Sequence, residues 1–150
     1  MGNGYFAVCG VVEIDGRILL VRHTYGVAKD RILVPGGYVE EKELPNYAIE
    51  REILEETGVI ARAKALLSIQ FKTNQWCPVF LCEYVGGTPL TDHYENSEVL
   101  LLDIDVAIER QDLTNMSREI LKIYKAHKET AWKKKPYLAK GLSEQEYALF

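Results

Sequence analysis

Continuous and alternating runs of hydrophobic residues divide much of the chain into predicted strands. Residues 5–14 are nearly all apolar or small, which predicts a strand covered on both faces. The Asp15-Gly16 pair predicts a hairpin turn, and residues 17–21 predict the returning strand. Pro78 predicts a sheet edge or a bulge within its own apolar run. Further strands are predicted at residues 32–34, 60–72, 76–84 and 99–104.

Two other segments carry the signals of helices. Pro45 suits the first turn of a helix and Gly58 suits the left-handed position after its end, so we predict a helix from Leu44 to Thr57. A second helix is predicted from about Ser117 to Lys128, with a core-facing stripe made of Ile120, Leu121 and Tyr124.

The remaining pattern concerns the tail and the number of domains. The tail from Lys133 is expected to dock on the domain or on a partner, and its apolar residues are Tyr137, Leu138, Leu142, Tyr147 and Phe150. Because we find no internal repeat and no linker, residues 1–150 are predicted to form a single domain with both α and β elements.

Composition and charge exclude several classes of protein. With 47% hydrophobic and 27% charged residues the chain resembles an ordinary soluble globular protein. Its net charge of −4 argues against broad nucleic-acid binding. No apolar run approaches about 20 residues, and the first residues lack the basic region of a signal peptide, so we expect a cytoplasmic protein without membrane contact. The cysteines fit no disulfide or zinc pattern and are expected to be reduced core residues: Cys9, Cys77 and Cys82.

Three carboxylates share one face of the first predicted helix. Glu52, Glu55 and Glu56 are three and four residues apart, and like charges at this spacing repel by about 0.2–0.5 kcal/mol per pair. The last turn of a helix also disfavours anions. Arg51 is the single basic residue of that helix and cannot neutralise all three. The pattern favours a hard divalent cation such as Mg²⁺ or Mn²⁺, and the alternative is an acidic, solvated helix face.

This stretch resembles the Nudix box, Gly-x5-Glu-x7-Arg-Glu-U-x-Glu-Glu-x-Gly-U, in which U is aliphatic. Lys42 stands where many members of the family have glycine, although that position is outside the signature. Every specified position is matched between residues 37 and 59, by Gly37, Glu43, Arg51, Glu52, Ile53, Glu55, Glu56, Gly58 and Val59. The resemblance to the Nudix hydrolase family implies an α+β fold with a mixed β-sheet in an α/β/α sandwich.

The resemblance also implies roles for individual residues. Mg²⁺ or Mn²⁺ would be bound by the carbonyl of Gly36 and by Glu52, Glu55 and Glu56. Glu52 is the first candidate for orienting or deprotonating water, and Glu98 is a second catalytic candidate, with a solvated residue before a strand as the alternative. Structural roles fall to Gly37, Glu43, Arg51 and Gly58, with Arg51 expected to pair with Glu43.

Substrate recognition is the least specified part of the sequence. Arg22 and Arg31 precede the box and are candidates for phosphate contacts, and Tyr38 is a candidate for stacking on a base. Surface charge and rim packing are their respective alternatives. Asn74 and Trp76 occupy positions where ADP-ribose and dinucleoside polyphosphate enzymes of the family have their markers, and neither marker is met.

The resemblance therefore implies metal-dependent hydrolysis of a pyrophosphate bond in a nucleoside diphosphate joined to a group X. X is left open between nucleoside triphosphates, nucleotide sugars and similar small diphosphates. The alternative is a Nudix-like domain that binds or senses a nucleotide derivative without cleaving it. An isoprenoid diphosphate isomerase would need further catalytic residues that we cannot place. A homodimer is compatible with the resemblance, but nothing in the sequence fixes an interface.

Overall fold

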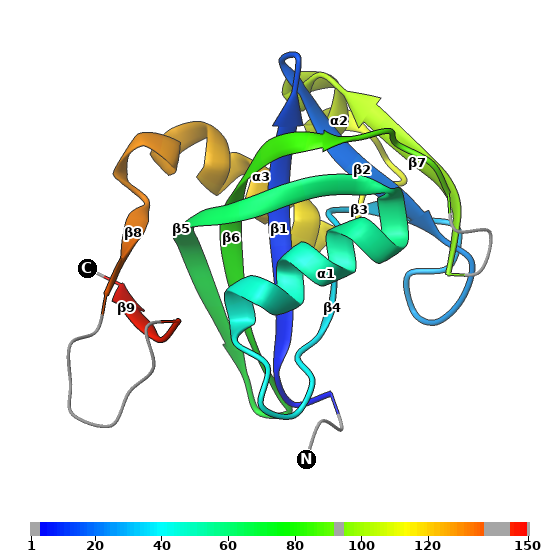
Figure 1. Ribbon diagram of the computed structural model, residues 1–150. Helices are drawn as coiled ribbons and strands as arrows, with labels where there is room; N and C mark the ends of the chain where they lie inside the picture. The colour runs from blue at the N-terminus through cyan, green and yellow to red at the C-terminus, as the bar shows by residue number, and fades with distance from the viewer. Residues whose placement is uncertain (1–3, 92–94, 137–144, 150) are drawn as a thin grey trace.

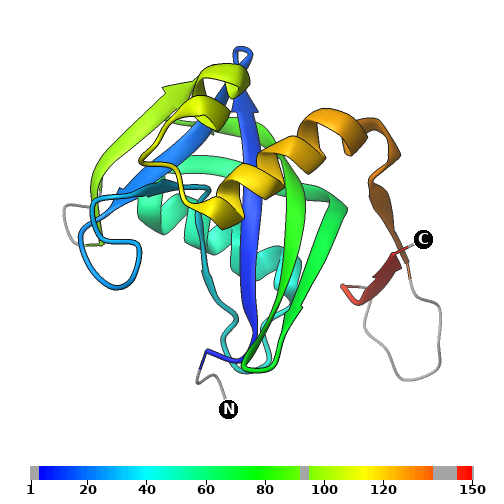
Figure 2. The ribbon, with the colours of Figure 1, turned by 180° about the vertical axis from the view of Figure 1, so that it is seen from behind.

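The computed structural model describes residues 4–91, 95–136 and 145–149. The helices are α1 (Pro45–Thr57), α2 (Ile104–Glu109) and α3 (Asn115–His127), and a 3₁₀ turn follows at Lys128–Thr130. The strands are β1 (Ala7–Ile14), β2 (Arg17–His23), β3 (Ile32–Leu33), β4 (Gly36–Tyr38), β5 (Val59–Lys72), β6 (Gln75–Gly87), β7 (Asn96–Leu102), β8 (Trp132–Pro136) and β9 (Tyr147–Leu149). Helix α1 lies in front of the strands in Figure 1, and the view from behind in Figure 2 shows α3 across their other face.

The strands form a mixed sheet in the order β3-β2-β1-β6-β5-β8-β9, in which β1 and β6 are parallel and the other pairs are antiparallel. Strand β2 is paired with β1 only beside the hairpin turn, at Glu13↔Ile18 and Ile14↔Arg17. Beyond this point β4 takes the same edge of β1, and β2 pairs instead with β3 and β7. The sheet therefore divides between β2 and β4.

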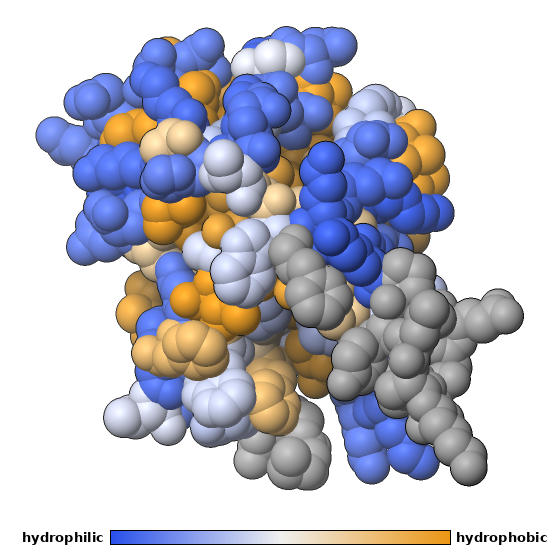
Figure 3. Space-filling view, turned by 90° about the vertical axis from the view of Figure 1, so that its left-hand side faces the viewer, coloured by the Kyte–Doolittle hydropathy of each residue, from blue (hydrophilic) through white to orange (hydrophobic). Residues whose placement is uncertain are grey.

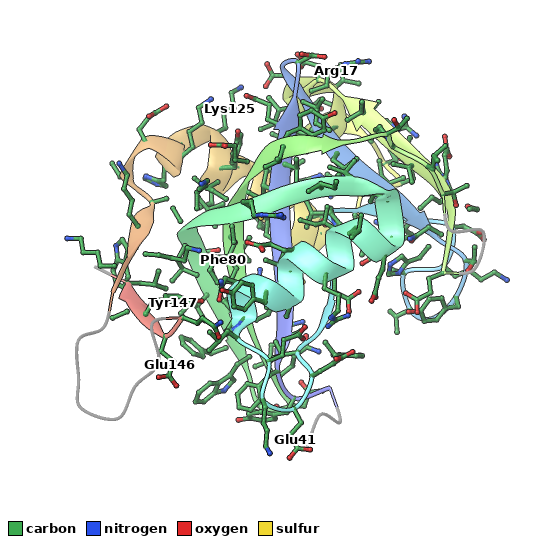
Figure 4. All side chains as sticks on the ribbon, viewed as in Figure 1. Arg17, Glu41, Phe80, Lys125, Glu146 and Tyr147 are labelled. Carbon is green, nitrogen blue, oxygen red and sulfur yellow. The ribbon has the colours of Figure 1, made fainter. Side chains whose placement is uncertain are left out.

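Two hydrophobic cores lie on opposite faces of the sheet. Val8 and Val12 of β1 contribute to the core under α1, whereas Val11 contributes to the core under α3. This alternation follows from the two-residue repeat of a strand, and it confirms that the first strand is covered on both faces. Phe80 is 1% exposed and lies between α1 and the sheet (Figure 4), with Ile49 and Ile53 in the same core.

Most predicted elements are present, with shifted ends. Helix α1 begins at Pro45 after the cap residue Leu44, and Gly58 ends it in the left-handed conformation (φ 74°). The hairpin turn also uses positive φ, 50° at Asp15 and 77° at Gly16. The predicted end of the sixth strand at Tyr84 was too early, because β6 continues through Gly87, whose backbone lies opposite Val59 of β5.

Several short elements were missed, β8 and β9 of the tail among them, and one strand was misplaced. Neither β4 nor α2 was predicted. The strand predicted at 99–104 is β7, which begins at Asn96 and ends at Leu102; Ile104 instead begins α2, where the Asp103 side chain accepts a hydrogen bond from the backbone N–H of Asp105.

Pro78 lies inside the sheet, because β6 pairs with both β1 and β5. The pairing with β1 is a single bridge at Phe6↔Trp76, and it becomes continuous only from Cys9↔Val79. On the other side, the register with β5 shifts between Leu66 and Ser68. Of the two predictions for Pro78, the bulge or irregularity is therefore confirmed and the sheet edge is wrong. The irregularity has a physical cause, because proline has no N–H to contribute to a continuous ladder.

The described part of the tail docks on the domain, as expected. Strand β8 pairs with β5 at Leu66↔Trp132, and Leu149 of β9 packs against the core under α1. Tyr147 points toward the lower end of α1 in Figure 4, and burial raises the pKa of its hydroxyl to about 12. The other predicted tail contacts lie outside the described residues: Tyr137, Leu138, Leu142 and Phe150.

A groove lined by β5, the end of α3 and β8 opens on the face shown in Figure 3, where apolar side chains lie between polar ones. Trp132 on its rim is 58% exposed. Within the described ranges, no helix is both long and apolar enough to cross a membrane.

Candidate active site

The carboxylates of α1 lie in its last turns with different degrees of burial. Glu56 is 2% exposed, whereas the side chains of Glu52 and Glu55 are 13% and 59% exposed. The last turn of α1 contains no basic residue that could offset the helix dipole. The helix therefore brings a buried, a partly buried and an exposed carboxylate to one face. No basic side chain in its last turn offsets the repulsion among them.

Glu56 is an incompletely neutralised buried acid. Its Oε1 accepts a hydrogen bond from the backbone N–H of Gly36 at 3.2 Å, and its Oε2 accepts one from Asn96 Nδ2 at 3.4 Å. Burial, followed by the negative charge of Glu52, raises the pKa of Glu56 from about 4.5 to about 8. Burial also raises the pKa of Glu52, against the opposing effect of Arg51. Both carboxylates would be stabilised as anions by a nearby cation.

Arg51 connects the helix to the segment before it. Its Nε and Nη2 donate to the two carboxylate oxygens of Glu43 at 2.8 and 2.9 Å, a bidentate ion pair. Its Nη1 donates to Glu52 at 2.8 Å and to Glu55 at 3.2 Å, and Nη2 also donates to the carbonyl of Tyr38. The pKa of Glu43 is lowered, chiefly by its hydrogen bond with Arg51. The structure thus pairs Arg51 with Glu43 and places the same guanidinium between Glu52 and Glu55.

The two glycines before the helix let the backbone approach these carboxylates. Gly36 lies opposite Cys9 in the antiparallel pair of β4 and β1, and its N–H points to Glu56 instead of β1. In such a position the N–H and C=O of a residue face the same side of the strand, so the Gly36 carbonyl is also directed away from β1. A Cβ at Gly36 would lie 2.3 Å from the carbonyl oxygen of Val8, so a side chain does not fit there.

Gly37→Ala is expected to lower the activity more than the stability. The new Cβ would lie 2.3–2.6 Å from the carboxylate atoms of Glu52, and the flexible end of that side chain can move away. We expect a loss of roughly 100-fold in kcat, because a displacement of about 1 Å can have that effect, with less than about 1 kcal/mol lost in unfolding free energy. Gly86→Ala is the matched control, since a Cβ there meets nothing within 4 Å. Equal kinetics for the two variants would contradict this prediction.

A pocket of about 670 Å³ opens in front of these groups, where β2 and β4 separate. Its lining includes the guanidinium of Arg51 and the carboxylates of Glu40, Glu52, Glu55, Glu56 and Glu95. Apolar parts of the wall come from Ala7, Val8, Leu33, Val34 and Met116. The pocket thus combines an acidic side with an apolar side.

Aromatic rings stand at the pocket wall. Tyr38 and Tyr25 are 55% and 52% exposed, and the rings of His23 and Tyr25 are stacked with centroids 5.5 Å apart. Tyr38, a candidate for stacking on a base, therefore lines the pocket. His23, at the end of β2, and Tyr25, in the segment that follows, extend this aromatic surface.

Three predicted site residues lie outside the pocket lining. Arg22 donates to Glu98 at 2.8 Å and to Asp112 at 3.0 Å. Arg31 donates through Nη2 to the carbonyl of Leu113. The pocket lining therefore gives no support to the catalytic role predicted for Glu98 or to the phosphate contacts predicted for Arg22 and Arg31, which stay predictions.

Arg22 and Glu98 lie outside the pocket lining because side chains alternate between the two faces of a strand. His23 of β2 lines the pocket, so its neighbour Arg22 points to the opposite face, and Glu98 lies directly across from Arg22 on β7. Glu95, at the entry to β7, is the pocket residue that sequence reasoning missed. Glu95 lies three residues before Glu98, in the same polar segment of the sequence.

Glu95→Gln and Glu98→Gln are expected to separate these two positions. Glu95 faces Glu52 and Glu56 closely enough to raise the pKa of each, so its neutralisation should lower kcat/KM by about 10–100-fold, as for residues that support metal ligands. Glu98 is half exposed in a surface ion pair, and its variant should keep activity within about twofold and lose at most about 1 kcal/mol of stability. Steady-state kinetics and thermal unfolding test both; a larger kinetic loss for Glu98→Gln would reverse the assignment.

The donor set suits a hard divalent cation in its chemistry. Carboxylate and carbonyl oxygens are the ligands that Mg²⁺ and Mn²⁺ prefer, and among the described residues the hydrogen-bond partners of the buried Glu56 carboxylate are the neutral groups of Gly36 and Asn96. Over the described ranges, no three His, Cys, Asp or Glu side chains are already grouped around one point as ligands. Arg51 Nη1 bridges Glu52 and Glu55 in the position of a cation.

Comparisons with known proteins give one family and one fold. The family model of the NUDIX domain matches residues 4–124. An ADP-ribose pyrophosphatase of Methanocaldococcus jannaschii is 36% identical over 87 residues, 54% of this chain and 52% of that protein. The chain thus spans about half the length of this relative.

Solved structures agree in architecture. A MutT NUDIX hydrolase from Burkholderia pseudomallei superposes with a TM-score of 0.70 at 24% identity, covering 80% of this chain and 97% of its own. A UDP-X diphosphatase superposes with a TM-score of 0.66 at 26% identity, covering 85% of this chain and 66% of its own. These similarities confirm the mixed sheet between helices.

Proposed function

This chain belongs to the NUDIX domain family, and from that premise we propose that it hydrolyses a pyrophosphate bond in a nucleoside diphosphate joined to a group X. The observation that supports the proposal most directly is the convergence of Glu52, Glu55 and Glu56 on a pocket beside Gly36. The burial of Glu56, which raises the pKa of that group to about 8, opposes its ionisation and so favours a role in binding a cation over a role in stability.

The carbonyl of Gly36 and the carboxylates of Glu52, Glu55 and Glu56 would hold Mg²⁺ or Mn²⁺. When bound, such ions offset the charge of a diphosphate and lower the pKa of water. Glu52 and Glu55 would exchange their contacts with Arg51 Nη1 for this role. The bidentate pair of Arg51 with Glu43 uses Nε and Nη2 and can persist during the exchange.

Glu52 is the residue we assign to the attacking water. Its carboxylate is 13% exposed, borders the pocket and is fixed between Arg51 and the backbone at Gly37. From this position it can orient the water or accept its proton while an oxygen–phosphorus bond forms. The bridging phosphorus–oxygen bond then breaks, and the products are a nucleoside monophosphate and the phosphate of X.

The group X and the base would occupy the remaining wall of the pocket. The aromatic rings of Tyr38 and Tyr25 offer stacking surfaces, and the apolar side chains of Leu33 and Met116 can cover a sugar or a base. ADP-ribose and UDP-linked compounds are the first substrates to examine, because the relative and the structural neighbour described above carry those names.

Product analysis after incubation with a substrate panel tests the proposal. The panel contains ADP-ribose, UDP-sugars, dinucleoside polyphosphates and nucleoside triphosphates, each with Mg²⁺, Mn²⁺ or a chelator. We expect metal-dependent release of a nucleoside monophosphate, with ¹⁸O from labelled water in one product. Tight binding of a panel member without turnover in either metal would instead support a binding or sensing domain.

A further inference from the structure

Two thiols face each other in the wall of the same pocket, outside the carboxylate cluster. Cys9 belongs to β1 and Cys77 to β6, and their Sγ atoms are 3.5 Å apart. Both residues line the pocket, with Cys9 partly exposed and Cys77 buried. The proposed hydrolysis uses neither thiol, so the pair needs a separate explanation.

The pairing of β1 and β6 brings the thiols together. Cys9 is directly opposite Val79 in this parallel pair, which makes Cys77 its diagonal neighbour on the same face. The ladder is interrupted between Trp76 and Val79, where Pro78 has no N–H to donate. Gly36 lies directly beside the pair, because a Cβ there would be 3.1 Å from the Sγ of Cys9.

The separation of the two sulfur atoms suits a bridging ion better than a direct bond. A disulfide requires about 2.0 Å between sulfurs, whereas the two Sγ atoms here are 3.5 Å apart. A zinc ion binds thiolates at about 2.3 Å. With that bond length, sulfurs 3.5 Å apart subtend an angle of about 100° at the ion, close to tetrahedral.

We propose that Cys9 and Cys77 bind one thiophilic divalent cation, of the Zn²⁺ or Cd²⁺ class, with its other positions open to the pocket. Thiolates select such ions over Mg²⁺, so this site and the carboxylate site differ in their preferred metal. An ion here would border Gly36 and the pocket.

Cadmium titration of reduced, metal-free protein tests this site without any substrate. We expect one equivalent of Cd²⁺ per chain to produce the ultraviolet sulfur-to-cadmium charge-transfer band. Cys9→Ser and Cys77→Ser should each lose most of the band. Cys82→Ala and Glu52→Gln should keep it, because Cys82 lies in the core under α1 and Glu52 belongs to the carboxylate site. A band that survives both serine variants, or is absent from the wild type, would overturn the proposal.

Two measurements on the unaltered chain guard against misfolded variants. X-ray absorption at the cadmium edge should resolve two sulfur ligands, and one or none would refute a site made by this pair. Titration of the denatured protein should find three free thiols. A value of one would mean that the pair forms a disulfide, which also overturns the proposal. All these results stand whether or not the chain hydrolyses a diphosphate.

Discussion

Glu52→Gln is expected to lower kcat by roughly 1,000-fold and to leave the fold intact. The amide cannot accept a proton from water and is a weaker ligand for a hard cation, and loss of general-base function alone typically removes about 10²–10⁴ in rate. The side-chain shape is retained, and the amide oxygen can still accept from Arg51 Nη1, whose present distance to Glu52 is 2.8 Å. Kinetics at saturating Mg²⁺ on the panel substrate that the wild type cleaves best provide the measurement.

A control on the same helix separates this role from a general effect of charge. Glu50→Gln also removes one negative charge from α1, but Glu50 accepts a hydrogen bond from the backbone N–H of Ala63 in β5 and does not line the pocket. Its kcat should stay within about threefold of the wild type. If Glu52→Gln retained more than a tenth of the wild-type kcat, another group would have to act on the water.

Local signals in the sequence located α1 almost completely. Pro45 and Gly58 determine the ends of a helix through backbone geometry within one or two residues, so tertiary contacts were not needed to find them. The spacing of Glu52, Glu55 and Glu56 followed from the same helix. The α+β class and the family were likewise available from the box at residues 37–59.

Long-range pairing explains what the sequence did not reveal. Strand β4 exists because Gly36–Tyr38 pairs with β1, and two glycines carry no strand pattern of their own. Strand β7 begins at Asn96, a buried polar residue whose side chain donates to Glu56, so hydrophobicity placed the strand three residues late. That shift concealed Glu95 and directed attention to Glu98, which the alternation of the strand turns toward Arg22.

The sequence contains a capping residue for α2, but we had assigned that segment to a strand. Asp103 before Ile104 is a favourable helix cap, yet Ile104 was assigned to the end of an apolar strand. Short helices of this kind depend on packing against neighbours, here α3, more than on their own sequence. The contact between Cys9 and Cys77 is a similar case. The two residues are 68 positions apart in the sequence, and the register of β1 and β6 brings them together.

Glu56→Gln is expected to stabilise the metal-free protein at pH 8 while abolishing most of its activity. The folded-state pKa of Glu56 is about 8, above the value of about 4.5 for an exposed glutamate. The folded chain therefore holds a proton that the unfolded chain releases, and this contribution to stability is complete below about pH 4.5 and declines up to about pH 8. Each unit of difference corresponds to about 1.4 kcal/mol, so the wild type should lose a few kcal/mol across this window.

The glutamine variant removes that pH dependence. Its amide oxygen can accept from the Gly36 N–H, and a turn of the Asn96 amide allows the new N–H group to donate to Asn96 Oδ1. Denaturant unfolding of metal-free protein at pH 5 and pH 8 should show a larger decline for the wild type than for the variant. A wild-type stability that is equal at the two pH values would mean that Glu56 is not a buried acid with a raised pKa.

Added metal should reverse the order of stability. A cation at the carboxylate site binds the folded wild type and stabilises it by RT ln(1 + [L]/Kd), about 2.7 kcal/mol when its concentration is 100 times Kd. The variant lacks one anionic ligand next to Gly36 and should gain much less from the same concentration of Mg²⁺. Equal stabilisation of both proteins by Mg²⁺ would place the ion away from Glu56. The combination of higher metal-free stability with lost activity would identify Glu56 as a group whose burial is tolerated for the sake of metal binding.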